Sequence, residues 1–95
     1  SGPNPYAVKP IILRCSQRLM INKLVHVSTQ WFNASNLEEA FSRDECEIMQ
    51  REKFIGTVMQ VHPSTDELRV KFGNSAHWED NCYVWVPRSK VQILR

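Results

Sequence analysis

Cysteine and histidine are the residues of this chain best suited to metal binding or covalent chemistry. Zinc ligands usually come in close pairs, such as two cysteines about two to four residues apart or two histidines about three to five residues apart. No such pair is present, because the three cysteines and three histidines are widely spaced: Cys15, His26, Cys46, His62, His77 and Cys82. The sequence therefore predicts no metal site and no cofactor.

One enzymatic arrangement is conceivable, in which Cys82 is the nucleophile, His77 the base and Asp80 the carboxylate that orients the base. This spacing within one loop matches no known catalytic signature. Cys82 is better explained as a small core residue. We therefore predict that no residue is catalytic and that the protein is not an enzyme.

Aromatic side chains are the stronger functional signal, because they fall in predicted loops or on the outer face of a predicted strand. Trp31 and Phe32 lie in the first long loop, and Trp78 lies in a later one. Rings at such positions can line a peptide groove or a cage for a cation. Two carboxylates that follow Trp78 would favour a cationic partner. The predicted ligand-binding residues are Trp31, Trp78, Glu79, Asp80, Tyr83 and Trp85.

Plainer interpretations of the same residues stay open. The rings can simply cover the fold or pack under the long loop, and Glu79 and Asp80 can form the solvated tip of a loop. Arg69 and Lys71 project from one strand and could contact phosphates, but exposed basic residues are usually only a solvated face. Since no nucleic-acid motif accompanies them, we do not expect a nucleic-acid partner.

Length and composition limit the class of protein. The chain has 95 residues, 42% hydrophobic and 23% charged, as in an ordinary soluble domain. Three prolines assign residues 1–17 to an extended N-terminal arm, and residues 18–95 to a single domain. No apolar run approaches the roughly 20 residues of a membrane span, so we expect no membrane partner. Widely spaced cysteines, odd in number, indicate an intracellular protein, cytoplasmic or nuclear.

Apolar alternation predicts five strands. The first runs from Leu19 to about Val27 with a possible bend at residues 22–23, and the two clearest, residues 54–62 and 68–72, form a hairpin.

The fourth predicted strand covers residues 82–86. Its smaller residues share the inner face, whereas Tyr83 and Trp85 share the other. Pro87 cannot donate to a β-ladder, so it should end this strand before one turn and a last strand at residues 91–94.

Helix signals occupy the segment between the first two strands. Asn36 and Ser42 each begin a capping-box sequence with Glu three residues later. We therefore expect a short helix starting at Asn36, or two short helices joined at Ser42, in the segment that ends at Arg51.

The order of these elements is that of SH3 domains. The C-terminal segment at residues 85–94, Trp-Val-Pro-Arg-Ser-Lys-Val-Gln-Ile-Leu, resembles the ending of SH3 domains. The Gly-Thr-Val that begins at Gly56 is similar to a segment of Tudor and KOW barrels. We therefore predict a mainly β fold, a five-stranded SH3/Tudor-like barrel with a helix-containing insertion between the first two strands.

Two ubiquitin-ligase modules also resemble this chain. The SH3-like repeats of the Mind bomb family share an outline onto which the following residues can be laid: Trp31, Gly56, Val58, Val61 and Trp85. The CPH domain of cullin-type ligases has a similar Tyr-x-Val or Tyr-Trp-Val sequence before its hydrophobic last strand, and residues 83–86 take that place here. The Gly-Asp that usually precedes the first strand is Asn22-Lys23 here, and the Mind bomb Gly-Trp pair is Gln30-Trp31.

These resemblances imply a non-catalytic protein or peptide interaction module. It would recruit a partner or substrate for a larger ubiquitin-related or scaffolding protein. The alternative is a chromatin reader that holds a methylated lysine or arginine in an aromatic cage. In either case the expected partner is a protein or peptide segment, with a cationic or methylated side chain in the second.

Overall fold

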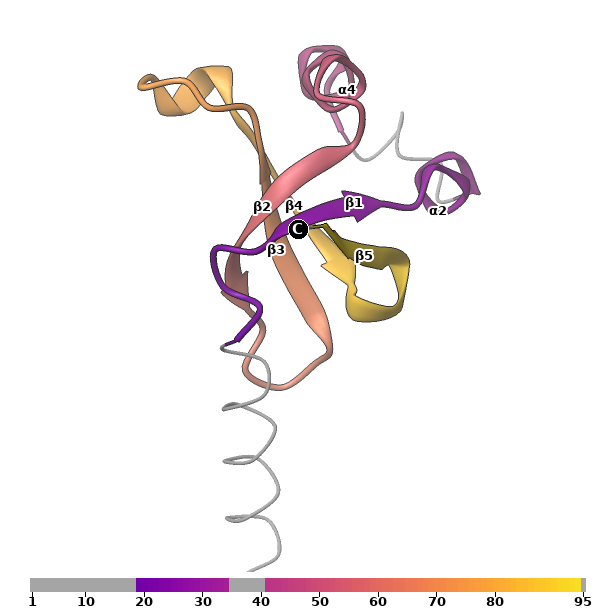
Figure 1. Cartoon of the computed structure of the whole chain (residues 1–95). Coiled ribbons are helices and arrows are strands. Elements are labelled where there is room, and N and C mark those ends of the chain that lie inside the picture. Colours follow the sequence, from indigo (N-terminus) through magenta and orange to yellow (C-terminus); the bar gives the residue numbers. More distant parts are fainter. Residues whose placement is uncertain (1–18, 35–40, 95) are drawn as a thin grey trace, which may run out of the picture.

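The computed structural model describes residues 19–34 and 41–94, which form a mainly β structure with helices between its first two strands (Figure 1). The predicted N-terminal arm and the predicted helix start at Asn36 lie outside the described residues. The elements in chain order are β1 (Leu24–Val27), α2 (Thr29–Ala34), α4 (Arg43–Arg51), β2 (Ile55–Val61), β3 (Glu67–Phe72), the 3-10 turn η1 (Trp78–Asp80), β4 (Cys82–Pro87), the 3-10 turn η2 (Arg88–Lys90) and β5 (Val91–Leu94).

The five strands form one antiparallel sheet in the order β4-β3-β2-β1-β5. In Figure 1, β1 runs across the direction of β3. The edges of the sheet are β4 and β5, and no hydrogen-bonded ladder joins them within the described residues. The sheet is therefore open, whereas the sequence predicted a barrel.

Apolar residues from all five strands share one core because strand side chains alternate between the two faces. On β4 the burial pattern alternates strictly, with Cys82, Val84 and Val86 buried. Helices α2 and α4 add to the same core, which consists of Met20, Val25, Val27, Phe32, Ile48, Met49, Val58, Leu68, Val70, Phe72, Cys82, Val84, Val86 and Val91.

Helix α4 begins at the second of the two capping-box sequences, as in the alternative of two helices joined at Ser42. Ser42 is its N-cap, and Oγ of Ser42 accepts from the backbone N–H of Glu45 at 3.2 Å, while Oε1 of Glu45 accepts from the backbone N–H of Ser42 at 3.2 Å. This reciprocal pair satisfies two donors that the first turn of a helix would otherwise leave free.

Two local predictions were wrong. The first strand does not begin at Leu19: the bend expected at residues 22–23 is present, since Asn22 adopts a φ of 70°, but no strand precedes it in the described residues, and β1 starts at Leu24. Phe32 is not exposed in a loop: it lies on α2, a helix that the sequence did not predict, and its ring packs edge-on against Phe54 at 5.0 Å.

Replacing Gly56 by alanine should destabilise the domain by about 1–3 kcal/mol, the usual cost of overfilling a packed site. The added Cβ would lie 2.6 Å from the backbone oxygen of Lys71 and 2.6 Å from Cγ1 of Val70. Chemical denaturation measures the change. Thr57→Ala, a control at the next and less buried position, should cost less than about 1 kcal/mol. Equal stability of Gly56→Ala and wild type would contradict the close approach of β2 and β3.

Candidate functional site

The outer face of β2, β3 and β4 carries a group of aromatic, basic and amide side chains. We call this surface the outer strip and define it by Gln60, His62, Arg69, Lys71, Tyr83 and Trp85. The ladder places Arg69 opposite Trp85 and Lys71 opposite Tyr83 across β3 and β4. The opposite side of the same strands forms the core. The strip is therefore held by the most regular part of the fold.

Arg69 links the three strands of the outer strip. Its guanidinium carbon lies 4.9 Å from the centre of the Tyr83 ring, a cation-π geometry. Its Nη1 also donates to Oε1 of Gln60 at 3.0 Å. A shift in register between Val58 and Gln60 brings Gln60 opposite Arg69. These contacts fix the arginine across the centre of the strip.

Trp85 is the largest ring of the outer strip and lies on β4, at the edge of the sheet. It is 39% exposed, although Val84 and Val86 on either side of it are buried. The His62 ring packs edge-on against it, with ring centroids 5.4 Å apart. This contact holds the indole from one side and leaves much of its surface in water.

The positive charge of the outer strip has no carboxylate partner within the described residues. The ion pairs there join Arg43 to Glu47, Arg51 to Glu52 and His77 to Glu79, and none includes Arg69 or Lys71. The nearest carboxylate on the same strand belongs to Glu67, which instead accepts a hydrogen bond from Oγ1 of Thr65 at 3.3 Å. A ligand on this surface would therefore meet rings, the cations of Arg69 and Lys71 and, at the start of β3, the carboxylate of Glu67.

The second group of predicted site residues lies on η1, in the loop between β3 and β4. Trp78 is 75% exposed. Oε1 of Glu79 lies 4.0 Å from Nδ1 of His77, and Asp80 accepts a hydrogen bond from Oγ of Ser75 at 3.4 Å. The carboxylates thus make contacts within their own loop, and no ring contact joins Trp78 to Tyr83 or Trp85 in the described part of the chain.

Trp31 lies on α2, partly buried against the core. The core occupies the face of β4 opposite to Tyr83 and Trp85, so the structure does not bring Trp31 to the outer strip. Of the four predicted rings, the structure groups Tyr83 and Trp85. Sequence reasoning did not include His62, Gln60 or Arg69 in this site, although it placed Arg69 on an exposed strand face.

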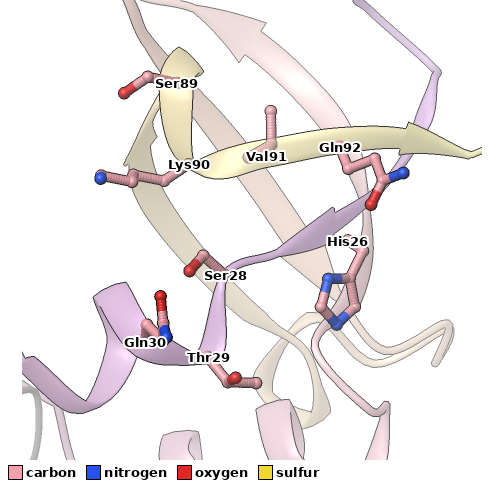
Figure 2. A pocket seen from close by; sticks show the side chains of 8 residues that line it. All are labelled: His26, Ser28, Thr29, Gln30, Ser89, Lys90, Val91 and Gln92. Atoms are coloured by element: carbon pink, nitrogen blue, oxygen red, sulfur yellow. The ribbon is translucent and has the colours of Figure 1, made fainter.

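A polar pocket of about 510 Å³ lies where β1, α2 and β5 meet, lined by His26, Ser28, Thr29, Gln30, Ser89, Lys90, Val91 and Gln92 (Figure 2). The backbone N–H of Ser28 donates to the carbonyl of Lys90 at 2.8 Å and joins its two sides. Figure 2 shows Lys90 extending away from His26 and Gln92. Because these polar groups do not converge, we assign no ligand to this pocket.

The structure gives Cys82 the environment of a core residue. Burial raises the pKa of its thiol to about 12, and the negative charge of Glu45 adds to the rise. The thiol donates to Oε2 of Glu45 at 3.8 Å. His77 contacts Glu79 instead, so no hydrogen bond assembles the conceivable cysteine, histidine and aspartate group in the residues described.

No group of three His, Cys, Asp or Glu side chains in residues 19–34 and 41–94 is arranged to hold a metal ion. In the same part of the chain, no helix has the length and apolarity to cross a membrane.

No family model, curated protein or solved structure gives a significant match to this chain. The resemblances to SH3, Tudor, Mind bomb and CPH domains therefore stay predictions.

Cys82 should be nearly inert toward alkylation in the folded protein. With a pKa of about 12, only about one thiol in ten thousand is the reactive thiolate at pH 8. We expect iodoacetamide to modify Cys82 at least about a hundredfold more slowly in native protein than in guanidinium, as measured by peptide mapping. Equal rates in the two conditions would contradict the buried, carboxylate-paired thiol.

Proposed function

We propose that this domain is a non-catalytic interaction module that binds a peptide segment of another protein through the outer strip. One observation carries the proposal: Trp85 is 39% exposed in the middle of a strand whose neighbouring side chains are buried. The indole packs against His62 on one side and leaves the rest of its surface open to water. Together with Tyr83 and Arg69 beside it, the ring forms a surface patch of the kind that marks interaction sites.

The composition of the outer strip supports protein binding over other functions. Tryptophan, tyrosine and arginine are the residues that most often dominate the energy of protein interfaces. Here Trp85, Tyr83 and Arg69 lie side by side on two paired strands. Their contacts with His62 and Gln60 restrict the side chains before a partner arrives, which lowers the entropy lost on binding.

The order of the strands supports the further proposal that the sheet, although open between β4 and β5, curves as an SH3-like barrel does. All five strands contribute to one core, and β5 returns to pair with β1. A role within a larger ubiquitin-related or scaffolding protein is proposed only from the sequence resemblance to Mind bomb repeats and CPH domains.

A methyl-lysine or methyl-arginine reader is the second candidate function, favoured by the exposure of Trp78 next to Glu79 and Asp80. A cage needs several rings that converge on one cation. The guanidinium of Arg69 already lies over the ring of Tyr83, and Trp31 packs against the core. The peptide-binding function is therefore the better supported of the two.

Replacing both Tyr83 and Trp85 by alanine should abolish most of the binding. Peptides selected from a random display library on the wild-type domain serve as probes, and calorimetry measures their affinity. We expect the affinity to fall at least about tenfold, because truncating a central aromatic anchor typically costs about 2 kcal/mol or more. Trp78→Ala, which removes a more exposed tryptophan from η1, is the matched control and should bind within about threefold of wild type.

Circular dichroism must show that the double variant is folded. A folded variant with unchanged affinity would refute the assignment of the outer strip, and so would a selection that enriches no peptide. If the double variant does not fold, Arg69→Gln provides the second test, since it leaves both rings in place and should still weaken binding.

A further inference from the structure

Strand β4 is an edge of the sheet, and its backbone offers a second recognition element beside the outer strip. It pairs with β3 on one side and with no strand on the other within the described residues. In an antiparallel ladder, the residues whose N–H and C=O groups bond the neighbouring strand alternate with residues whose groups point the opposite way. The register decides which residues face the open edge.

Two hydrogen bonds establish that alternation independently. The backbone N–H of His62 donates to the carbonyl of Glu67 at 2.9 Å, so Glu67, Arg69 and Lys71 of β3 bond toward β2. The intervening residues of β3 therefore bond toward β4. In the ladder between β3 and β4, the backbone N–H of Arg88 donates to the carbonyl of Asp66 at 3.0 Å. Asp66 precedes Leu68 by two residues, so this bond shows that Leu68, Val70 and Phe72 also bond toward β4.

It follows that Val84 and Val86 bond β3 with their backbone groups, whereas Tyr83 and Trp85 direct theirs toward the open edge. No backbone or side-chain hydrogen bond occupies these groups of Tyr83 and Trp85 in the part of the chain that the structure describes. The residues whose rings lie on the outer face, the half-buried Tyr83 and the exposed Trp85, are thus also the residues with unpaired edge amides.

The opposite edge, β5, differs from β4 in this respect. It is shorter, and Nη1 of Arg88 donates to the carbonyl of Val91 at 3.4 Å, which occupies an acceptor on that edge. Soluble proteins often protect edge strands with charged side chains or proline. Strand β4, with the sequence Cys-Tyr-Val-Trp-Val-Pro, has no charged side chain, and its one proline is at the last position.

We infer that the open edge of β4 is a docking site for an extended acidic peptide segment, which adds as a further strand and pairs with the backbone of Tyr83 and Trp85. This inference rests on the proposed function and specifies its binding mode. Main-chain hydrogen bonds supply affinity in this mode, and alternate side chains supply specificity. Pro87 lacks an N–H donor and limits the pairing at the end of the strand.

Charge complementarity identifies the occupant. Side chains of an added strand on the outer face would lie beside the rings of Tyr83 and Trp85. From there, long carboxylate side chains can reach toward Arg69 and Lys71, which have no ion-pair partner in the described residues. A lysine-rich strand would meet like charge at the same positions.

Backbone N-methylation tests this mode without changing a side chain. Cys82 permits chemical ligation of a synthetic segment, residues 82–95, to the rest of the chain. N-methyl-Trp85 loses the edge donor and retains the indole. N-methyl-Ile93 is the matched control, because the bond from Ser28 N–H to Lys90 C=O places the amide of Ile93 on the open edge of β5. Circular dichroism verifies that both proteins fold.

The probes are the acetylated peptide amides Thr-Glu-Val-Glu-Val-Glu-Thr and Thr-Lys-Val-Lys-Val-Lys-Thr. We expect the acidic peptide to bind wild type at least about tenfold more tightly than the basic peptide. N-methyl-Trp85 should weaken binding of the acidic peptide at least about tenfold, and N-methyl-Ile93 should change it less than about threefold.

Unchanged affinity of N-methyl-Trp85 for the acidic peptide would overturn the edge mode. If Tyr83→Ala/Trp85→Ala nevertheless lost binding, the outer strip would survive as the site and only the strand addition would fail. Equal binding of the two peptides would overturn the acidic assignment. Sedimentation tests whether the wild-type protein self-associates. If it does, and N-methyl-Trp85 abolishes the association, then the edge of β4 binds a second copy of the chain and not a peptide, which would also overturn the proposal.

Discussion

The alternation of side chains along β4 is the constraint on which the rest of the structure depends. The side chains of Val84 and Val86 are buried in the core, and each buried valine of this kind contributes about 1.5–3 kcal/mol to folding. Strand geometry then forces Tyr83 and Trp85 onto the opposite face. The domain cannot withdraw these rings into its core without losing the packing of the valines.

The same alternation gives β4 its two recognition surfaces. Tyr83 and Trp85 present rings on the outer face, where Arg69 lies over one ring and His62 packs against the other. Their backbone groups face the open edge because the bonds of Val84 and Val86 are directed to β3. A partner that pairs with the edge would also contact the rings, so a single strand can combine main-chain affinity with side-chain selectivity.

Local sequence patterns were sufficient for the elements that depend on local chemistry. Alternation predicted the strands from β2 to β5, and the capping box at Ser42 predicted the start of α4. Helix α2 was missed because it is only six residues long and Phe32 is held by packing against Phe54, a residue distant in the sequence. The unpaired edges of β4 and β5 were likewise not predicted, because they depend on how the strands pair in space.

The candidate site was predictable to a similar extent. Period-two alternation placed Tyr83 and Trp85 together, but the contact of Arg69 with Tyr83 requires the register of β3 against β4. The contact of Arg69 with Gln60 depends in addition on the register shift in β2, which leaves no clear signal in the sequence. Trp31 was grouped with these residues because a ring in a loop cannot be distinguished, by sequence alone, from one packed against a core.

Amide hydrogen exchange, resolved by residue in NMR spectra, tests the central claim most directly. If β4 has an open edge, the amides of Tyr83 and Trp85 should exchange much faster than those of Val84 and Val86, which bond β3. Addition of the acidic peptide should slow the exchange of Tyr83 and Trp85. Equal and strong protection of all four amides in the free protein would contradict the open edge, and unchanged exchange in the presence of bound peptide would contradict strand addition.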